Sequence, residues 1–335
     1  KINTYSVEFD FLGGVNELEK ARAVASYYGT NHHELSISGS DVSSCIERLA
    51  DSHGQPFGDA ANIPLYLMTK KVRSDVKVVL QGDGGDELFG GYSIYSTSFN
   101  MDKWKRLSFI SKALGFFASG HTRTLQVQRF FEAVGEKDRA LRNAKLLTME
   151  STHTDPLQIF SSELQEELRK HCPFESFIEF YQALPDNVDD LRAIFLTDTK
   201  ITLKNTFLEK VDKSTMANSV EVRVPFLDKA LAEYAMSVPA NLKVKGGKSK
   251  YLMKEALAGV VPDEVLYAKK TGFGVPYAHW LRSTLREFFL EHVSTASVSR
   301  VLDVPRILTL LDYHSSGKGN YGFLLWKTLN LAVWI

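Results

Sequence analysis

The sequence predicts an α/β fold: a parallel, doubly wound sheet followed by a large helical C-terminal portion. Strand-like and helical segments alternate through the first hundred residues, which is the pattern of βαβ units. From about residue 103 to 210 helical periodicity dominates and strand signals are few. We therefore divide one domain into an α/β part, residues 1–100, and a mainly helical remainder, residues 101–335.

Six segments make up the expected α/β part. The expected strands cover residues 4–9, 32–37 and 76–80, and the expected helices cover residues 16–28, 41–51 and 63–73. Asp41 is expected to cap the second helix. The last strand is an apolar run broken only by Lys77, so we expect it to be buried. Parallel sheets of this kind bind ligands at the carboxyl ends of their strands.

The remainder shows helical patterns separated by breakers. The expected helices cover residues 108–117, 125–134, 137–147, 161–170, 174–183 and 191–205. Prolines at positions 156, 173 and 185 punctuate them. The apolar tail, residues 322–335, contains Lys327 and Asn330 and is expected to be a helix that docks on the core.

Composition excludes several classes of protein. Forty basic and forty acidic residues cancel among 335, so bulk charge gives no argument for nucleic acid or an anionic membrane. No run of about 18 apolar residues occurs. Two cysteines, Cys45 and Cys172, are too few for a disulfide framework and suit a reducing, cytoplasmic setting. The first residue is Lys1, so we expect a piece of a longer polypeptide.

The most unusual stretch is residues 81–92, Gln-Gly-Asp-Gly-Gly-Asp-Glu-Leu-Phe-Gly-Gly-Tyr, here called the acidic loop. Asp83 or Gly84 is expected near the N-cap of a helix, with Asp86 and Glu87 in its first turn. Two interpretations stay open. The stretch is either a simple turn, or a site where carboxylates and bare backbone bind a cation and a phosphate.

Two later stretches are also unusual. Residues 211–228 carry charged groups among small apolar ones; for Asp212, Glu221, Arg223 and Asp228 a structural ion-pair lattice is the preferred interpretation. Residues 245–257 are a basic glycine turn leading into a helix. Its lysines at 245, 248 and 250 either meet phosphate oxygens or only solvate the helix start.

These stretches together resemble one family. Residues 81–92, 216–228, 247–253 and 269–276 match, in order, motifs of the synthetase domain of glutamine-dependent asparagine synthetases. Residues 4–9 and 21–34 fit the same pattern. The resemblance covers nearly the whole chain.

The resemblance implies a nucleotide-binding sheet of the adenine nucleotide α-hydrolase-like type, with ATP and Mg²⁺ as cofactors. A substrate carboxylate, that of aspartate, would attack the α-phosphorus of ATP to give an acyl-adenylate and pyrophosphate. Ammonia from glutamine would then form the amide, releasing AMP. Magnesium and lysines would hold the charged leaving group.

The resemblance also implies roles for particular residues. Asp86 would bind magnesium, while Asp83 and Lys250 would be catalytic: Asp83 in adenylate formation and proton removal from the amine, Lys250 in stabilising charge around the adenylate. Nucleotide contacts would come from Val7, Gln81, Gly82 and Gly84. Asp212, Glu221 and Arg223 would only support the site.

The chain also departs from the family. The pyrophosphate loop, Ser-Gly-Gly-x-Asp-Ser, is expected shortly before Thr4, and the glutaminase domain before that; neither is in this sequence. We therefore expect the chain alone to be inactive. Glu8, Gln55 and Gln81 replace usual residues. Two alternatives follow: a related amidotransferase or β-lactam-forming ligase acting on another carboxylate, or a degenerate, non-catalytic module. The assembly state, a homodimer among the options, stays open.

Overall fold

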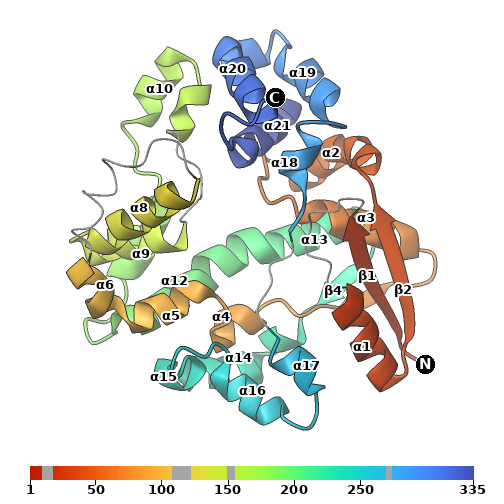
Figure 1. Cartoon of the computed structure of the whole chain (residues 1–335), viewed down its shortest axis with the longest axis vertical. Coiled ribbons are helices and arrows are strands. Elements are labelled where there is room, and N and C mark those ends of the chain that lie inside the picture. The colour runs from red at the N-terminus through yellow and green to blue at the C-terminus, as the bar shows by residue number, and fades with distance from the viewer. Residues whose placement is uncertain (10–17, 108–121, 149–154, 269–273) are drawn as a thin grey trace.

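The computed structural model describes residues 1–9, 18–107, 122–148, 155–268 and 274–335, which form a helix-rich α/β structure with little sheet (Figure 1). Its strands are β1 (Asn3–Phe9), β2 (Asn31–Ile37), β3 (Val78–Leu80) and β4 (Glu221–Arg223). The first three fall where the sequence predicts strands. The fourth was not expected, since the stretch that contains it is short and rich in charge.

The strands pair in two separate parallel sheets. β1 lies beside β2 with Val7 opposite Leu35, and β3 lies beside β4 with Val79 opposite Val222. The parallel direction agrees with the expected α/β fold. A single doubly wound sheet stays a prediction, because within the described residues no hydrogen bonds join the two pairs. The β3–β4 pairing brings the second unusual stretch beside the acidic loop.

The expectation that residues 76–80 form a buried strand is wrong. The side chains of Val78 and Leu80 are 42% and 72% exposed, while Val79 between them is half-buried. Successive strand residues point to opposite faces, so only the face that carries Val79 is covered. An apolar run predicts burial on both faces, and the described residues supply packing on one.

Three helices follow the N-terminal strands as expected: α1 (Leu18–Tyr28), α2 (Gly39–His53) and α3 (Asn62–Val72). The cap of α2 was misplaced, since Ser38 and not Asp41 occupies the N-cap. Asp41 instead occupies the third helical position. Its carboxylate accepts a hydrogen bond from the Ser38 backbone N–H, with 2.9 Å between N and Oδ2. This is the reciprocal half of a capping box, which the sequence offers three residues before the predicted start.

The remaining helices include those expected over residues 125–134, 137–147, 161–170, 174–183 and 322–335, whereas most of the helices between residues 225 and 315 had not been predicted. In chain order they are α4 (Gly85–Phe89), α5 (Ser93–Phe99), α6 (Met101–Leu107), α8 (Thr122–Gly135), α9 (Arg139–Leu147), η1 (Pro156–Ile159), α10 (Ser162–Leu168), α11 (Glu175–Gln182), α12 (Asp190–Thr197), η2 (Asp198–Leu208), α13 (Glu209–Met216), η3 (Pro225–Leu227), α14 (Lys229–Ser237), α15 (Ala240–Lys243), α16 (Tyr251–Leu257), α17 (Asp263–Leu266), α18 (Tyr277–Trp280), α19 (Arg286–Val293), η4 (Val298–Arg300), α20 (Val304–Ser315) and α21 (Gly322–Trp334).

One expected helix differs from the structure, and another cannot be compared. The helix predicted over residues 191–205 ends as α12 at Thr197 and continues as the π-helix η2. The one expected over residues 108–117 lies outside the described residues. No helix in the described part of the chain is long and apolar enough to cross a bilayer.

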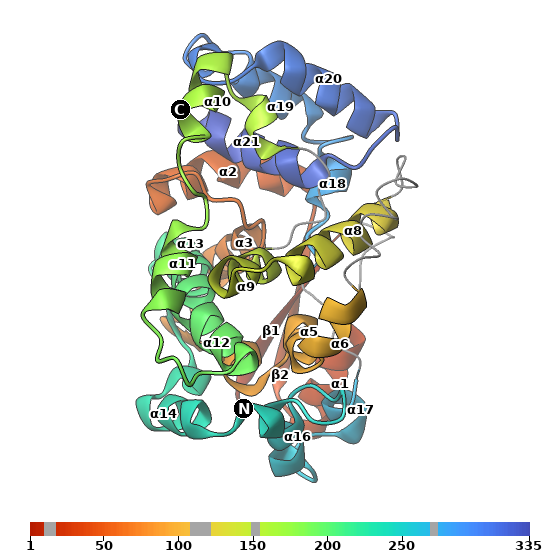
Figure 2. The same cartoon turned by 90° about the vertical axis from the view of Figure 1, so that its left-hand side faces the viewer.

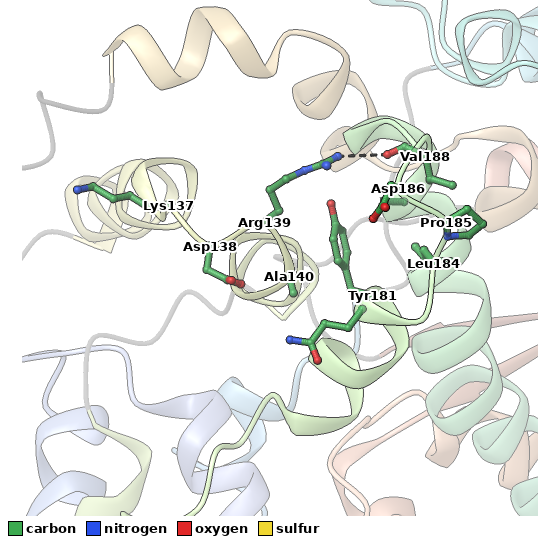
Figure 3. Close-up of a pocket in the computed structure, with 11 residues that line it drawn as sticks. Lys137, Asp138, Arg139, Ala140, Tyr181, Leu184, Pro185, Asp186 and Val188 are labelled. Atoms are coloured by element: carbon green, nitrogen blue, oxygen red, sulfur yellow. Dashed lines mark hydrogen bonds between the residues drawn. The ribbon is translucent and has the colours of Figure 1, made fainter.

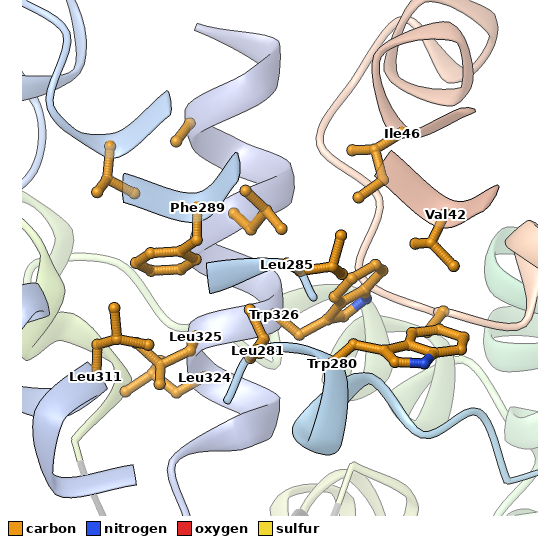
Figure 4. Packing of buried hydrophobic residues seen from close by; sticks show 14 of the residues in the cluster. Val42, Ile46, Trp280, Leu281, Leu285, Phe289, Leu311, Leu324, Leu325 and Trp326 are labelled. Atoms are coloured by element: carbon orange, nitrogen blue, oxygen red, sulfur yellow. The ribbon is translucent and has the colours of Figure 1, made fainter. Parts of the chain in front are cut away.

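The largest core cluster surrounds the C-terminal helix (Figure 4). Trp326 of α21 is 1% exposed and packs among Leu281, Leu285 and Phe289, with Ile46 of α2 in the same cluster. Figures 1 and 2 both place α21 next to α2, at the end of the molecule that holds the last helices. The expected docking of the tail on the core is confirmed.

A second cluster backs the acidic loop. Tyr95 of α5 stacks on Phe195 of α12, with ring centroids 4.1 Å apart, and both side chains are buried. Val134 and Leu146 join them from α8 and α9. The division at residue 100 stays a prediction; both clusters contain residues from each side of it.

We predict that Trp326→Ala lowers the free energy of unfolding by about 3–5 kcal/mol, because it removes a buried indole and leaves a cavity. Trp334→Ala is the matched control on the same helix, since that indole is 50% exposed. Urea unfolding followed by circular dichroism measures both. Equal losses for the two variants would contradict the described packing of α21.

Candidate active site

The acidic loop connects β3 to the short helix α4. Gly84 is the N-cap of α4 with φ of +85°, and a Cβ there would lie 2.5 Å from Leu227 Cδ2. Only glycine meets both requirements. Asp86 and Glu87 stand in the first turn of α4, as expected. The loop is therefore held in one conformation by its own glycines and by the residues after β4.

Asp86 meets Lys250 across the site. The Lys250 ammonium Nζ lies 2.9 Å from Asp86 Oδ1, with the two side chains 24% and 17% exposed. Lys250 begins α16 with φ of +52°, and its backbone N–H donates to the Gly90 carbonyl oxygen at 3.1 Å. The third unusual stretch is thus anchored on the acidic loop through both backbone and side chain.

Gly91 leaves the room for that ion pair. A Cβ at this position would lie 1.5 Å from Asp86 Oδ1 and 2.6 Å from Lys250 Cε. Those separations are far below van der Waals contact, so any side chain at residue 91 would displace the carboxylate, the ammonium or both. The second glycine of the Gly-Gly pair is therefore required by the site rather than by its own backbone.

The second unusual stretch, residues 211–228, packs against the acidic loop. Arg223 accepts the Gln81 backbone N–H on its carbonyl oxygen at 3.0 Å, and the Phe226 ring packs against Phe89 at 6.2 Å between centroids. The expected ion-pair lattice is limited in the described contacts to Arg223 and Glu221, whose exposed groups lie 2.9 Å apart. The stretch acts mainly through backbone and aromatic packing.

Asp83 lies in a crowded electrostatic environment. Its Oδ2 is buried and forms no hydrogen bond within the described residues. Burial raises the pKa of the Asp83 carboxyl, the Lys210 ammonium opposes that rise, and the Asp59 and Asp86 carboxylates add to it. The group is therefore held closer to protonation at neutral pH than an ordinary aspartate.

Lys210 and Asp59 were not among the predicted site residues. Their Nζ and Oδ2 atoms lie 2.9 Å apart, in a pair that is mostly buried on the lysine side. Lys210 stands one residue before the stretch 211–228, and Asp59 ends a loop rich in glycine and proline. Neither position carries a local signal of charge pairing, so only the tertiary structure brings them to Asp83.

Two further carboxyl groups are buried: Glu87 in the acidic loop itself, and Asp198 in η2, which packs against α4. Glu87 accepts the Tyr92 hydroxyl at 2.6 Å, and Asp198 accepts the Tyr95 hydroxyl. Burial is the main cause that raises the pKa of both carboxyl groups, and their mutual repulsion adds to the rise for Glu87. The two tyrosine hydroxyls supply the hydrogen bonds that such groups need away from water.

The described residues contain no cluster of three or more histidine, cysteine or carboxylate groups placed to hold a metal ion. Magnesium in nucleotide enzymes is usually held by one or two carboxylates, with substrate phosphates and water completing its coordination. Asp86, with Asp83 nearby, fits that limited role. The site does not offer a cage made of protein alone.

The other residues predicted to contact the nucleotide lie in two separate places. Gln81, Gly82 and Gly84 lie in the acidic loop, whereas Val7 lies in β1, in the other sheet, against the large core cluster. Among the lysines of residues 245–257, Lys245 places its ammonium 4.7 Å from the Tyr251 ring centroid. The motif at 269–276 falls largely outside the described residues.

A separate cavity of about 400 Å³ lies in the helical part (Figure 3). Arg139, on its wall, donates to the Val188 carbonyl at 3.2 Å and to Asp190 at 2.9 Å, and lies over the Tyr181 ring. Its guanidinium is thus already engaged. None of the predicted site residues lines this cavity.

Glu87→Gln tests the buried carboxyl group without removing its shape or the acceptor for Tyr92. A raised pKa means that the folded protein holds the proton more tightly than the unfolded chain, so stability falls as pH rises above about 4.5. The free energy of unfolding of Glu87→Gln should therefore fall less with rising pH than that of the wild type. The difference in stability between the two should shift in favour of the variant as pH rises. Unfolding free energies from pH 4 to 8 measure it, with the exposed Glu179→Gln as control; parallel curves for Glu87→Gln and the wild type would refute the assignment.

Comparison with known proteins agrees with the motifs. The sequence matches the asparagine synthase family over residues 1–335. It is 30% identical to asparagine synthetase 1 (glutamine-hydrolysing) of Bacillus subtilis, with 99% of this chain and 52% of that protein covered. It is also 30% identical to a putative asparagine synthetase of Mycobacterium tuberculosis, covering 100% and 50%.

A more distant relative carries a different name. The amidase chyE of Penicillium rubens is 24% identical over 82% of this chain and 44% of its own length. The chain spans about half the length of the two asparagine synthetases it matches. The family match over residues 1–335, together with 30% identity to a relative across 99% of the chain, shows that this chain belongs to the asparagine synthase family.

Proposed function

We propose that the protein containing this chain is an ATP-dependent amide ligase that makes asparagine from aspartate, with ammonia supplied by glutamine. The observation that carries this proposal is the Asp86–Lys250 contact of 2.9 Å, because it joins the acidic loop to the basic turn in one partly buried site. The names of the two asparagine synthetases support the choice of aspartate and glutamine.

The first step would form a β-aspartyl-adenylate. An oxygen of the aspartate side-chain carboxylate attacks the α-phosphorus of ATP, the bond from that phosphorus to the bridging oxygen breaks, and pyrophosphate leaves with the electron pair. Negative charge grows on the leaving group and on the α-phosphoryl oxygens. The Lys250 ammonium is the group that would stabilise it from the protein side.

The second step would form the amide. The ammonia nitrogen attacks the acyl carbon, the acyl C–O bond breaks, and AMP leaves with its electrons. The attacking nitrogen must lose a proton, and Asp83 would accept it. A raised pKa suits this role, because a base works best when its pKa approaches the pH at which it operates.

Magnesium, when bound, would supply charge neutralisation to the phosphates. Asp86 is the residue we assign to hold it, with Asp83 as the neighbouring carboxylate. Gln81, Gly82 and Gly84 would face the nucleotide through backbone groups, while Val7 would contribute from β1.

A second candidate keeps the chemistry and changes the carboxylate. Gln81 replaces a usual serine at the start of the acidic loop, Glu8 and Gln55 are also unusual, and one relative is named as an amidase. A screen of carboxylic acids by pyrophosphate release would select this candidate if aspartate were silent and another acid active. A full-length protein with no activity on any acid would favour the degenerate module. Inactivity of this segment alone stays a prediction.

The test is aspartate-dependent exchange between ATP and pyrophosphate in the full-length protein. Asp86→Asn should abolish exchange, and Lys250→Ala should slow it by about a hundredfold to a thousandfold, as for loss of one charge-stabilising group. Lys229→Ala is the control, since that ammonium is 88% exposed on α14. An Asp86→Asn enzyme with ordinary magnesium dependence would contradict the assignment.

Gly91→Ala should reduce exchange by about a hundredfold, because its Cβ would push Asp86 and Lys250 apart by an ångström or more. Gly317→Ala is the control, because its Cβ would meet nothing within 4 Å, although the φ of +73° at Gly317 strains any side chain placed there. Gly317→Ala carries the backbone strain and leaves the ion pair untouched, whereas Gly91→Ala disturbs the ion pair. Similar exchange rates for the two would show that Gly91 has no role in the site.

A further inference from the structure

The Lys210–Asp59 pair is a second opposite-charge pair beside the acidic loop. Lys210 is 9% exposed and its Nζ lies 4.9 Å from the Phe207 ring centroid, so the ammonium is held at a partly apolar position. The Phe207 ring in turn contacts Tyr92 at the end of the acidic loop, with 6.4 Å between centroids. The pair thus adjoins the same site as Asp86 and Lys250.

Asp59 is oriented for more than one partner. Its Oδ1 accepts the Ala61 backbone N–H at 3.0 Å, which fixes the carboxylate to its own loop, and Oδ2 faces Lys210. The side chain is 27% exposed. A carboxylate that is held by its backbone and still reached by solvent can exchange Lys210 for a cationic ligand group.

Lys210 adjoins the acidic loop through the Phe207 ring, which contacts Tyr92, whereas Lys250 adjoins it through its backbone hydrogen bond to Gly90. The site therefore has two halves, and charges from both act on the Asp83 carboxyl group. Asp86 and Lys250 lie in one half, with charges suited to phosphates. Lys210 and Asp59 lie in the other, and present one positive and one negative group 2.9 Å apart.

An amino acid carries that pattern in reverse. We propose that Lys210 binds the α-carboxylate and Asp59 the α-ammonium of the amino-acid substrate, leaving the side-chain carboxylate to react beside Asp83. This inference rests on the proposed function and names the residues that would recognise its amino-acid substrate. Charge-assisted hydrogen bonds to both groups replace the internal pair, so neither charge is left buried alone.

The test compares aspartate with two analogues in the exchange assay on the full-length protein. Succinate lacks the α-ammonium, and β-alanine lacks the α-carboxylate. Lys210→Gln should raise KM for aspartate about tenfold or more, leave KM for ATP within about twofold, and narrow the preference for aspartate over β-alanine. Asp59→Asn should raise KM for aspartate likewise and narrow the preference for aspartate over succinate.

Two further variants separate binding from folding. Lys210→Arg keeps the charge and should recover part of the preference for aspartate over β-alanine. Lys170→Gln removes an exposed lysine of an i,i+3 pair on another surface and should leave both KM values unchanged. Circular dichroism and the thermal midpoint of each variant establish that it folds.

Three outcomes are distinguishable. A selective rise in KM for aspartate in both variants supports the inference, even if the analogues give no exchange. An aspartate KM within twofold of the wild type, or KM values for aspartate and ATP that rise together, overturns it in favour of a structural ion pair. A wild-type protein with no aspartate-dependent exchange rejects the proposed function itself.

Discussion

The contact between Asp86 and Lys250 is the interaction on which the site depends. It requires a glycine at position 91 to make room, a left-handed residue at the start of α16, and a backbone hydrogen bond from Lys250 to Gly90. Together these features bring two segments that are far apart in the chain to one point. A small change in any of them moves a charged group, and charge placement is the main contribution that a protein makes to phosphoryl chemistry.

Five carboxyl groups lie in or around the acidic loop, those of Asp59, Asp83, Asp86, Glu87 and Asp198, and all are at least partly buried. Burial alone would make each ionised carboxylate costly. Two kinds of partner stabilise them. Lysines pair with the partly exposed groups, Asp86 and Asp59, and tyrosine hydroxyls donate to the buried ones, Glu87 and Asp198. Asp83 has neither arrangement on its buried oxygen, which sets it apart as a group available to a ligand.

Prediction from sequence succeeded where the deciding interactions are short in range. The helices after β1 and β2, the start of α4 at Gly84, and the docking of the apolar tail follow from capping, turn chemistry and periodicity. It was wrong for burial at Val78 and Leu80, because an apolar run does not say how many faces of a strand are covered. It misplaced the α2 cap because Ser38 and Asp41 offer the same chemistry three residues apart.

What the sequence determined by itself is the start of α4 in the acidic loop, with Gly84 at the N-cap and Asp86 and Glu87 in the first turn. What only the tertiary structure decided is which cation meets which carboxylate. Several lysines lie in or just before the two later stretches, yet Lys250 reaches Asp86 while Lys210 reaches Asp59. The reason is physical: a charge acts through space on whatever lies within a few ångströms, and the packing of α13 against α3 and of α16 against α4 sets those distances.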